Sequence, residues 1–195
     1  MAGRPPMPFL TDGVVALREF VAGDAPALAT IWSDPSIRVR NTVPAPTVDA
    51  ARDWVDRVRA RGRAGEAWEW AVVDVASGTL AGRRALKELC WQKRRAVAAC
   101  WIAPGFRGRR FAARSLRLAA AHAFAQGIVR VHAECETDNV ATIRSMLAAG
   151  MRHEGTLRAF YITPAGQALD QHVFGLLPED LEVAGELGTR EPGAR

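Results

Sequence analysis

Cysteine and long apolar runs are scarce in this chain. Its three cysteines, Cys90, Cys100 and Cys135, form no C-x-x-C motif, and no Cys/His pair has the spacing of a zinc site. We therefore expect reduced, buried thiols and no metal. No apolar run is long enough to cross a bilayer, and residues 1–8 lack the apolar region of a signal peptide. These absences favour a cytoplasmic protein without membrane association.

Lysine is almost absent too. Lys87 and Lys93 are the only two lysines, so the net charge of +5 rests on arginine. The arginines are spread along the chain, which favours a basic pocket for an anionic cofactor over a nucleic-acid surface. A basic nucleic-acid binder is the less favoured alternative. The four histidines are scattered without triad or metal spacing and are interpreted as structural or surface residues: His122, His132, His153 and His172.

The order of apolar patterns predicts one mixed α/β domain over residues 12–181. A loose arm is expected at 1–11 and a mobile tail at 182–195. Within the domain, a strand at 14–20 precedes two helices that begin near Asp24 and Thr47. Three strands follow, at 68–73, 79–89 and 96–102, and then a helix ending at Gly127, a strand at 128–135, a short helix and two last strands. This order indicates a single sheet with helices packed on it.

The most informative segment runs from Trp101 to Ala112. It passes from the end of an apolar strand, through a short turn rich in glycine and arginine, into a helix. Such an order leaves unpaired backbone N–H groups at a helix start beside cationic side chains. The amides and the helix dipole both favour negative charge, so the segment predicts a phosphate or pyrophosphate site.

The same segment is one of four motifs through which the chain resembles the GCN5-related N-acetyltransferase (GNAT) superfamily, in the branch that contains the ribosomal-protein N-terminal acetyltransferases. The resemblance covers about residues 14–181. The other motifs are the opening pairs Leu17-Arg18, Asp24-Ala25 and Asp34-Pro35, the Leu80-Ala81-Gly82 strand, and the set Asn139, Thr142, Gly150, Met151, Glu154, Gly155 and Arg158.

This resemblance implies a mostly antiparallel mixed sheet of about six to seven strands with about four helices. Two of the strands would splay apart where acetyl-CoA binds. The pyrophosphate would lie on the amides of residues 108–113, and a backbone N–H near Trp101 or Ile102 would stabilise the oxyanion. The implied cofactor residues are Trp101, Ile102, Ala103, Arg107, Gly108, Arg109, Arg110, Phe111, Ala112, Ala113 and Asn139.

Three positions depart from the family pattern. Arg110 occupies the inner glycine place of the loop, and Met146 the place of a tyrosine that often protonates the leaving thiolate. Ser145 is the nearest replacement for that tyrosine. The strand at 96–102 carries no carboxylate, so Glu88 and Glu134 on neighbouring strands are the candidate bases. A family member that binds acyl-CoA without turnover, as a regulatory domain, is the alternative that these departures leave open.

The resemblance further implies an acceptor amine, a protein N-terminus or a small molecule, that attacks the thioester in a ternary complex. It would enter between the first helices and the last strand pair, where Trp32, Trp68 and Trp70 are candidate walls. An unpaired edge strand in such a sheet also suits homodimer formation.

Overall fold

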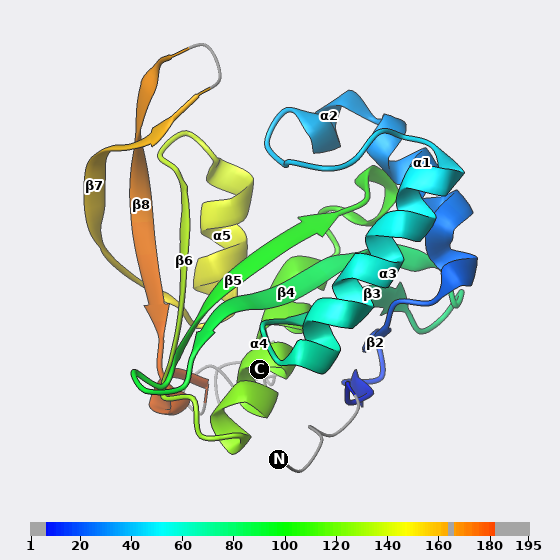
Figure 1. Cartoon of the computed structure of the whole chain (residues 1–195). Helices are drawn as coiled ribbons and strands as arrows, with labels where there is room; N and C mark the ends of the chain where they lie inside the picture. Colours follow the sequence, from blue (N-terminus) through cyan, green and yellow to red (C-terminus); the bar gives the residue numbers. More distant parts are fainter. Residues whose placement is uncertain (1–6, 164–165, 182–195) are drawn as a thin grey trace, which may run out of the picture.

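The computed structural model describes residues 7–163 and 166–181 (Figure 1). Its elements up to residue 102 are β1 (Leu10–Thr11), β2 (Val15–Glu19), the 3-10 helix η1 (Ala22–Asp24), α1 (Ala25–Ser33), α2 (Pro35–Arg38), α3 (Val48–Ala64), β3 (Trp68–Asp74), β4 (Leu80–Cys90) and β5 (Arg95–Ile102). After them come the 3-10 helix η2 (Pro104–Phe106), α4 (Phe111–Ala125), β6 (Arg130–Glu136), α5 (Val140–Ala148), β7 (Arg152–Ile162) and β8 (Ala168–Leu176).

The strands form one sheet in the order β1-β2-β3-β4-β5-β6-β8-β7. Every neighbouring pair is antiparallel except β5 and β6, which run parallel. This confirms the predicted mostly antiparallel mixed α/β sheet. The described residues contain eight strands, however, where six to seven were expected.

The additional strand lies within the segment expected to be a loose arm. Leu10 and Thr11 pair with β2, and the carbonyl of Pro8 accepts a hydrogen bond from Trp70 Nε1 at 3.1 Å. The part of the arm from residue 7 onward is therefore packed against the sheet. Residues 1–6 and the expected tail at 182–195 lie outside the described residues.

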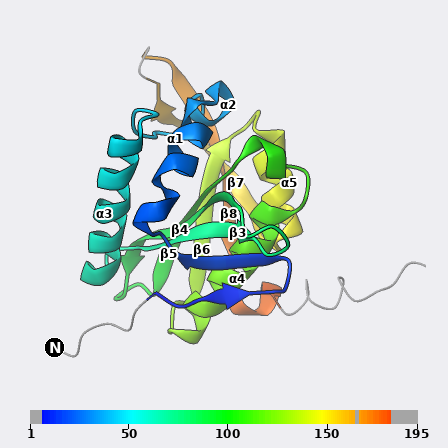
Figure 2. The same ribbon diagram turned by 90° about the vertical axis from the view of Figure 1, so that its right-hand side faces the viewer.

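Helices α1 and α3 cover one face of the sheet (Figures 1 and 2). The Thr47 hydroxyl accepts a hydrogen bond from Ala50 N at 3.2 Å and caps the start of α3, and Gly65 ends this helix with φ +72°. Apolar side chains from both helices pack on the sheet in a cluster that includes Leu28, Trp32 and Val55. We call this side of the sheet the α1/α3 face.

Helix α4 covers the opposite face, which we call the α4 face, with α5 beside it (Figure 2). The buried stripe of α4 is rich in alanine, including Ala119, Ala120 and Ala123, so the helix can approach the sheet closely. Cys135 is buried on this face, while the free thiols of Cys90 and Cys100 are half-buried. In the described part of the chain, no helix combines the length and apolarity needed to span a bilayer.

One glycine fixes how closely β4 and β5 approach. Gly82 pairs with Ile102, and a β-carbon at Gly82 would lie 2.4 Å from the carbonyl oxygen of Trp101. A side chain at position 82 would push the end of β5 away from β4. Glycine is therefore required here for contact between backbones.

Candidate functional site

Strands β5 and β6 separate soon after they begin. Their parallel ladder ends with the pair Val97 and His132. Beyond it β5 stays paired with β4 up to Ile102, and β6 stays paired with β8 up to Glu136. Figure 1 shows the two strands leaving a common base and diverging. Over residues 98–102, the side of β5 that faces β6 therefore has no strand beside it in the described part of the chain, as the predicted splay requires.

The turn between β5 and α4 leaves a row of amides open. Among the described residues, none accepts a hydrogen bond from the backbone N–H groups of residues 108–113. The first bond of the helix runs from Arg114 N to the carbonyl of Arg110, at 2.9 Å. Open amides at the start of a 15-residue helix, together with its dipole, make a site for an anion.

Two of the loop arginines are held by neighbouring groups. Arg107 Nε donates to the carbonyl of Ile102 at 3.1 Å, and its terminal nitrogen donates to Ser36 Oγ at 2.9 Å. The Arg109 guanidinium lies over two stacked rings, 5.3 Å from the centre of Phe106 and 4.9 Å from that of Phe111. These contacts fix the path of the chain between β5 and α4.

Arg110 has a different environment. It is exposed, and its guanidinium makes no hydrogen bond or ion pair with another described residue. Its backbone lies in the left-handed region, with φ +61° and ψ +13°. Glycine adopts this conformation without strain, whereas a residue with a β-carbon does not. The geometry explains why the family pattern has glycine at this place.

A buried arginine that was not predicted as a site residue holds the start of α4 against the sheet. Arg84, on β4, is only 4% exposed. One of its terminal nitrogens donates to the carbonyl of Ala112 at 2.6 Å and to Ser115 Oγ at 3.1 Å. Burial lowers the pKa of the Arg84 guanidinium. The available signal was an arginine among the apolar residues of β4, Leu80, Ala81, Ala85 and Leu86, because a buried arginine needs buried acceptors.

Three further predicted residues lie around α5 and in β6. Asn139 caps α5, and its side-chain oxygen accepts a hydrogen bond from Thr142 N at 3.3 Å. The Ser145 hydroxyl donates to the carbonyl of Ala141 at 2.9 Å, one turn earlier in the same helix. Glu134 lies on β6 with a carboxylate oxygen 3.6 Å from His132 Nε2.

Glu88 lies at the irregular end of β4. Its backbone has φ +53°, and its side chain is largely exposed, with a carboxylate oxygen 3.8 Å from Lys87 Nζ. Of the two candidate carboxylates, Glu134 is the one on a strand that borders the split, since Glu88 is separated from it by β5.

The three tryptophans expected to wall the acceptor cleft lie in the core instead. Trp32 and Trp70 are fully buried, and Trp68 is 9% exposed. Trp32 packs against Trp54 in the cluster under α1 and α3, whereas Trp68 and Trp70 face α4 and contact His122. For Trp68 and Trp70 the reason is that all seven residues of β3 are buried, so the sequence of the strand does not show which face each side chain takes. Trp32 lies on the buried side of α1, which packs on the sheet.

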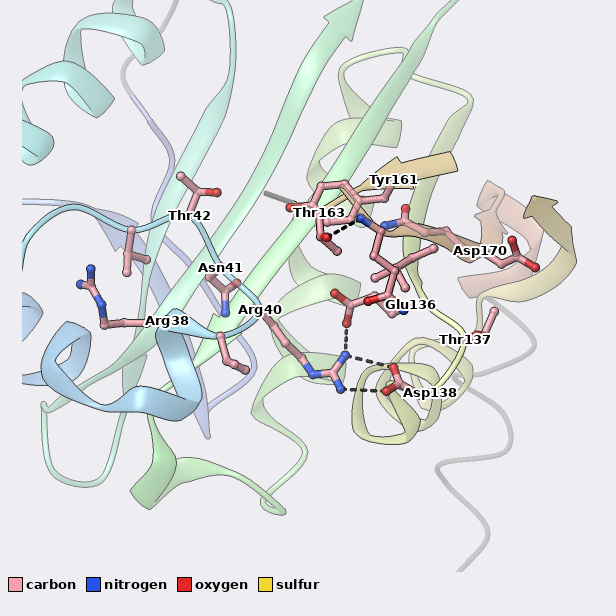
Figure 3. A pocket seen from close by; sticks show the side chains of 15 residues that line it. Arg38, Arg40, Asn41, Thr42, Glu136, Thr137, Asp138, Tyr161, Thr163 and Asp170 are labelled. Atoms are coloured by element: carbon pink, nitrogen blue, oxygen red, sulfur yellow. Dashed lines mark hydrogen bonds and ion pairs between the residues drawn. The ribbon is translucent and has the colours of Figure 1, made fainter. Parts of the chain in front are cut away.

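A cavity of about 840 Å³ is bounded by residues 38–43 at and after the end of α2, by residues 136–138 around the end of β6, and by the β7–β8 hairpin (Figure 3). That this cavity admits the acceptor stays a prediction. Its wall is polar and includes Glu136, Asp138 and Asp170.

Arg40 reaches from one wall of this cavity to the other. Its guanidinium pairs with Glu136 and lies 3.1 Å from the nearer oxygen of Asp138 (Figure 3). These bonds to Arg40 hold the pKa of Asp138 below its usual value. Two carboxylates in the wall of the cavity, Glu136 and Asp138, therefore already form ion pairs with Arg40.

The comparisons with known proteins agree with this geometry. The sequence profile described as "Acetyltransferase (GNAT) domain" matches residues 15–152. Among solved structures, the chain is similar to Mycobacterium smegmatis RimJ in complex with CoA-disulfide, with a TM-score of 0.79, 22% identity, and coverage of 93% of this chain and 91% of that one. It is also similar to a GCN5-related N-acetyltransferase from Brucella melitensis, with a TM-score of 0.77, 23% identity, and coverage of 93% and 84%.

A third similar structure is the ribosomal-protein-S5-alanine acetyltransferase from Vibrio fischeri, with a TM-score of 0.75, 14% identity, and coverage of 89% of this chain and 98% of that one. No curated protein sequence gives a significant match. Because the family profile spans most of the chain, the protein belongs to the GNAT acetyltransferase family.

Proposed function

We propose that this chain transfers an acetyl group from acetyl-CoA to a primary amine by direct attack in a ternary complex. One observation carries the proposal: the open amides of residues 108–113 begin α4 directly beside the free edge of β5. A long ligand with a diphosphate at one end and an amide-containing arm can use both features together. Coenzyme A has this construction, and the solved RimJ structure contains CoA-disulfide.

In this arrangement the diphosphate binds the amides of residues 108–113. The pantetheine arm extends along β5 from Ile102 back toward Val97 and uses the backbone groups that β6 leaves unpaired. Asn139, at the start of α5, borders the arm from the other side. The thioester then lies closer to the base of the split than the diphosphate does.

The chemistry needs few protein groups. The amine nitrogen attacks the thioester carbonyl, a backbone N–H near Trp101 or Ile102 stabilises the oxyanion, and the CoA thiolate leaves. Most of the rate gain comes from holding the two reactants together in the correct orientation. The acceptor enters through the cavity on the α1/α3 face, whose polar wall suits a protein N-terminus or a small polar amine.

The proposal is tested by calorimetry with acetyl-CoA, followed by a thiol-release assay with a panel of peptide and small-molecule amines. Binding together with amine-dependent release of CoA supports it. Failure to bind any acyl-CoA refutes it. Binding without turnover for any amine would instead support the alternative, a regulatory acyl-CoA-binding domain, which is favoured by Arg110 in its left-handed conformation.

A nucleic-acid role has less support from the surface. Arg114 and Arg117 follow Arg110 on α4, but Arg114 pairs with Asp12 at 2.8 Å and Arg117 donates to the carbonyl of Leu181 at 3.2 Å. These internal contacts reduce the cationic surface available to phosphates.

A further inference from the structure

Helix α2 and the loop after it bridge the two strands that diverge at the split. In α2, Ser36 Oγ accepts a hydrogen bond from Arg107 at 2.9 Å, and Arg107 Nε also donates to the carbonyl of Ile102, the last residue of β5. In the loop, Arg40 pairs with Glu136, the last residue of β6. The chain between Ser36 and Arg40 therefore spans the open end of the split, with one polar contact at each strand.

Residues 38–43, at and after the end of α2, form one wall of the cavity. The base of this segment is fixed, because Ile37 is fully buried in the cluster under α1 and α3, and its carbonyl accepts a hydrogen bond from Asn41 Nδ2 at 2.8 Å. Among the described residues, only Arg40 joins residues 38–43 to the opposite wall by a hydrogen bond or ion pair. Once the Arg40 contacts break, the loop can move away from that wall while Ile37 stays packed.

The ion pairs of Arg40 are weak enough to break and re-form. The Arg40 side chain is 37% exposed, and its partners Glu136 and Asp138 are 22% and 75% exposed. Water and salt screen such pairs, so each changes an equilibrium constant by about fivefold at most. Together they favour the closed position of the loop by roughly tenfold. A preference of this size permits opening during an encounter with an acceptor, but it reduces the affinity of any acceptor that needs the open position.

Arg40 also crosses the path between the cavity and the donor site. Figure 3 shows its side chain reaching from the loop to the end of β6. Its second partner, Asp138, directly precedes Asn139, which borders the pantetheine arm in the proposed complex. An acceptor that enters through the cavity therefore passes Arg40 before its amine reaches the thioester. A small amine needs little space there, whereas the end of a peptide brings a backbone and side chains with it.

We infer that Arg40 is a specificity-determining residue that closes the acceptor cavity to peptides. Its ion pairs with Glu136 and Asp138 hold residues 38–43 across the cavity, and they must break before a peptide N-terminus enters. Small amines enter with these ion pairs intact. The inference rests on the proposed function and deepens it, because it assigns the class of acceptor that the closed protein admits.

The test compares Arg40→Ala, Glu136→Gln and the double variant with the wild-type protein. Arg52→Ala is the matched control, because it removes an arginine from another exposed ion pair, with Asp49 at 3.0 Å on α3, outside the lining of the cavity. Thiol release gives kcat and KM for each peptide acceptor and for the amide of its own N-terminal amino acid, so the reacting amine is the same in both. Calorimetry gives the CoA affinity of every variant.

We expect Arg40→Ala to lower KM for peptides by about threefold to tenfold, while KM for the small amides, kcat and CoA affinity stay within about twofold of wild type. Glu136→Gln should lower the peptide KM less, because Asp138 keeps its bond to Arg40. The double variant should match Arg40→Ala, since both residues act through one contact. Added salt should lower the peptide KM of the wild type more than that of Arg40→Ala.

An unchanged peptide KM in Arg40→Ala, or an equal decrease in Arg52→Ala, overturns the inference and leaves the proposed function intact. A peptide KM that rises in Arg40→Ala also overturns it, by showing that Arg40 binds the acceptor and does not exclude it. Equal decreases for peptides and their small amides overturn the selection by size. Absence of turnover on any amine, in the wild type and in every variant, refutes the proposed function and this inference with it.

Discussion

Arg110→Gly directly tests whether the left-handed backbone at position 110 is strained. Arg110 has φ +61° and makes no side-chain contact with the described residues that would hold it there. The left-handed conformation costs a residue with a β-carbon roughly 1–2 kcal/mol. Glycine removes this strain but increases the entropy of the unfolded chain, which costs about 0.4–1 kcal/mol.

The difference predicts that Arg110→Gly raises the free energy of unfolding by roughly 0.5–1 kcal/mol. For a chain of this size, 1 kcal/mol corresponds to a rise in Tm of about 2–4 °C. Arg110→Ala is the matched control, because it removes the same guanidinium but keeps the β-carbon. It should remain within about 0.5 kcal/mol of wild type, as expected for an exposed side chain.

Calorimetric Tm and urea unfolding measure the stability, and titration with CoA measures the affinity. Both variants lose the same guanidinium, which makes no ion pair with a described residue, so any advantage of glycine over alanine reports the backbone alone. Equal Tm values for the two variants would refute the assignment of strain to position 110. If only Arg110→Gly gained CoA binding or turnover, the β-carbon at position 110, and not the guanidinium, would be what disables the wild-type loop.

Three other perturbations have defined outcomes. Gly82→Ala should lower the free energy of unfolding by roughly 1–3 kcal/mol through the clash with the Trp101 carbonyl. Gly105→Ala is the control, because a β-carbon there meets no atom within 4 Å, and it should leave the free energy of unfolding unchanged. Equal urea midpoints for the two variants would contradict the predicted clash. Arg84→Met should weaken CoA binding about tenfold, or roughly 1.5 kcal/mol, by releasing Ala112; unchanged calorimetric affinity would show that the loop needs no such support. Burial lowers the pKa of His122, so the stability that its neutral imidazole contributes is present above about pH 6.5 and is lost as the pH falls through the lower pKa of the folded state. Between about pH 7.5 and about pH 5.5, the urea midpoint should therefore fall less in His122→Gln than in the wild type. An equal fall in both proteins would show that His122 does not contribute to this pH dependence.

Patterns that depend on local sequence predicted most of the fold. Alternation along β6 separates Val131, Ala133 and Cys135 from His132 and Glu134 without any knowledge of the sheet. Chain order and the start of α4 likewise follow from periodicity and turn residues. Short or fully buried strands carry no such signal, which explains both the missed pair Leu10–Thr11 and the wrong surroundings expected for the tryptophans of β3.

The site was harder to predict because it depends on where strands stop pairing. Nothing in the sequence of β5 indicates that its ladder with β6 ends at Val97, since strand pairing depends on contacts between segments far apart in the chain. The loop amides could be expected from the helix start alone.

The end of the β5–β6 ladder links the two halves of the proposed reaction. In the proposed complex, the divergence leaves the edge of β5 free for the pantetheine arm. Strand β6 continues to Glu136, in the wall of the acceptor cavity. Under the proposed function, the separation of the two parallel strands after Val97 opens the donor site at the edge of β5. A substitution that extended the β5–β6 ladder by one pair should consequently impair CoA binding and amine access together.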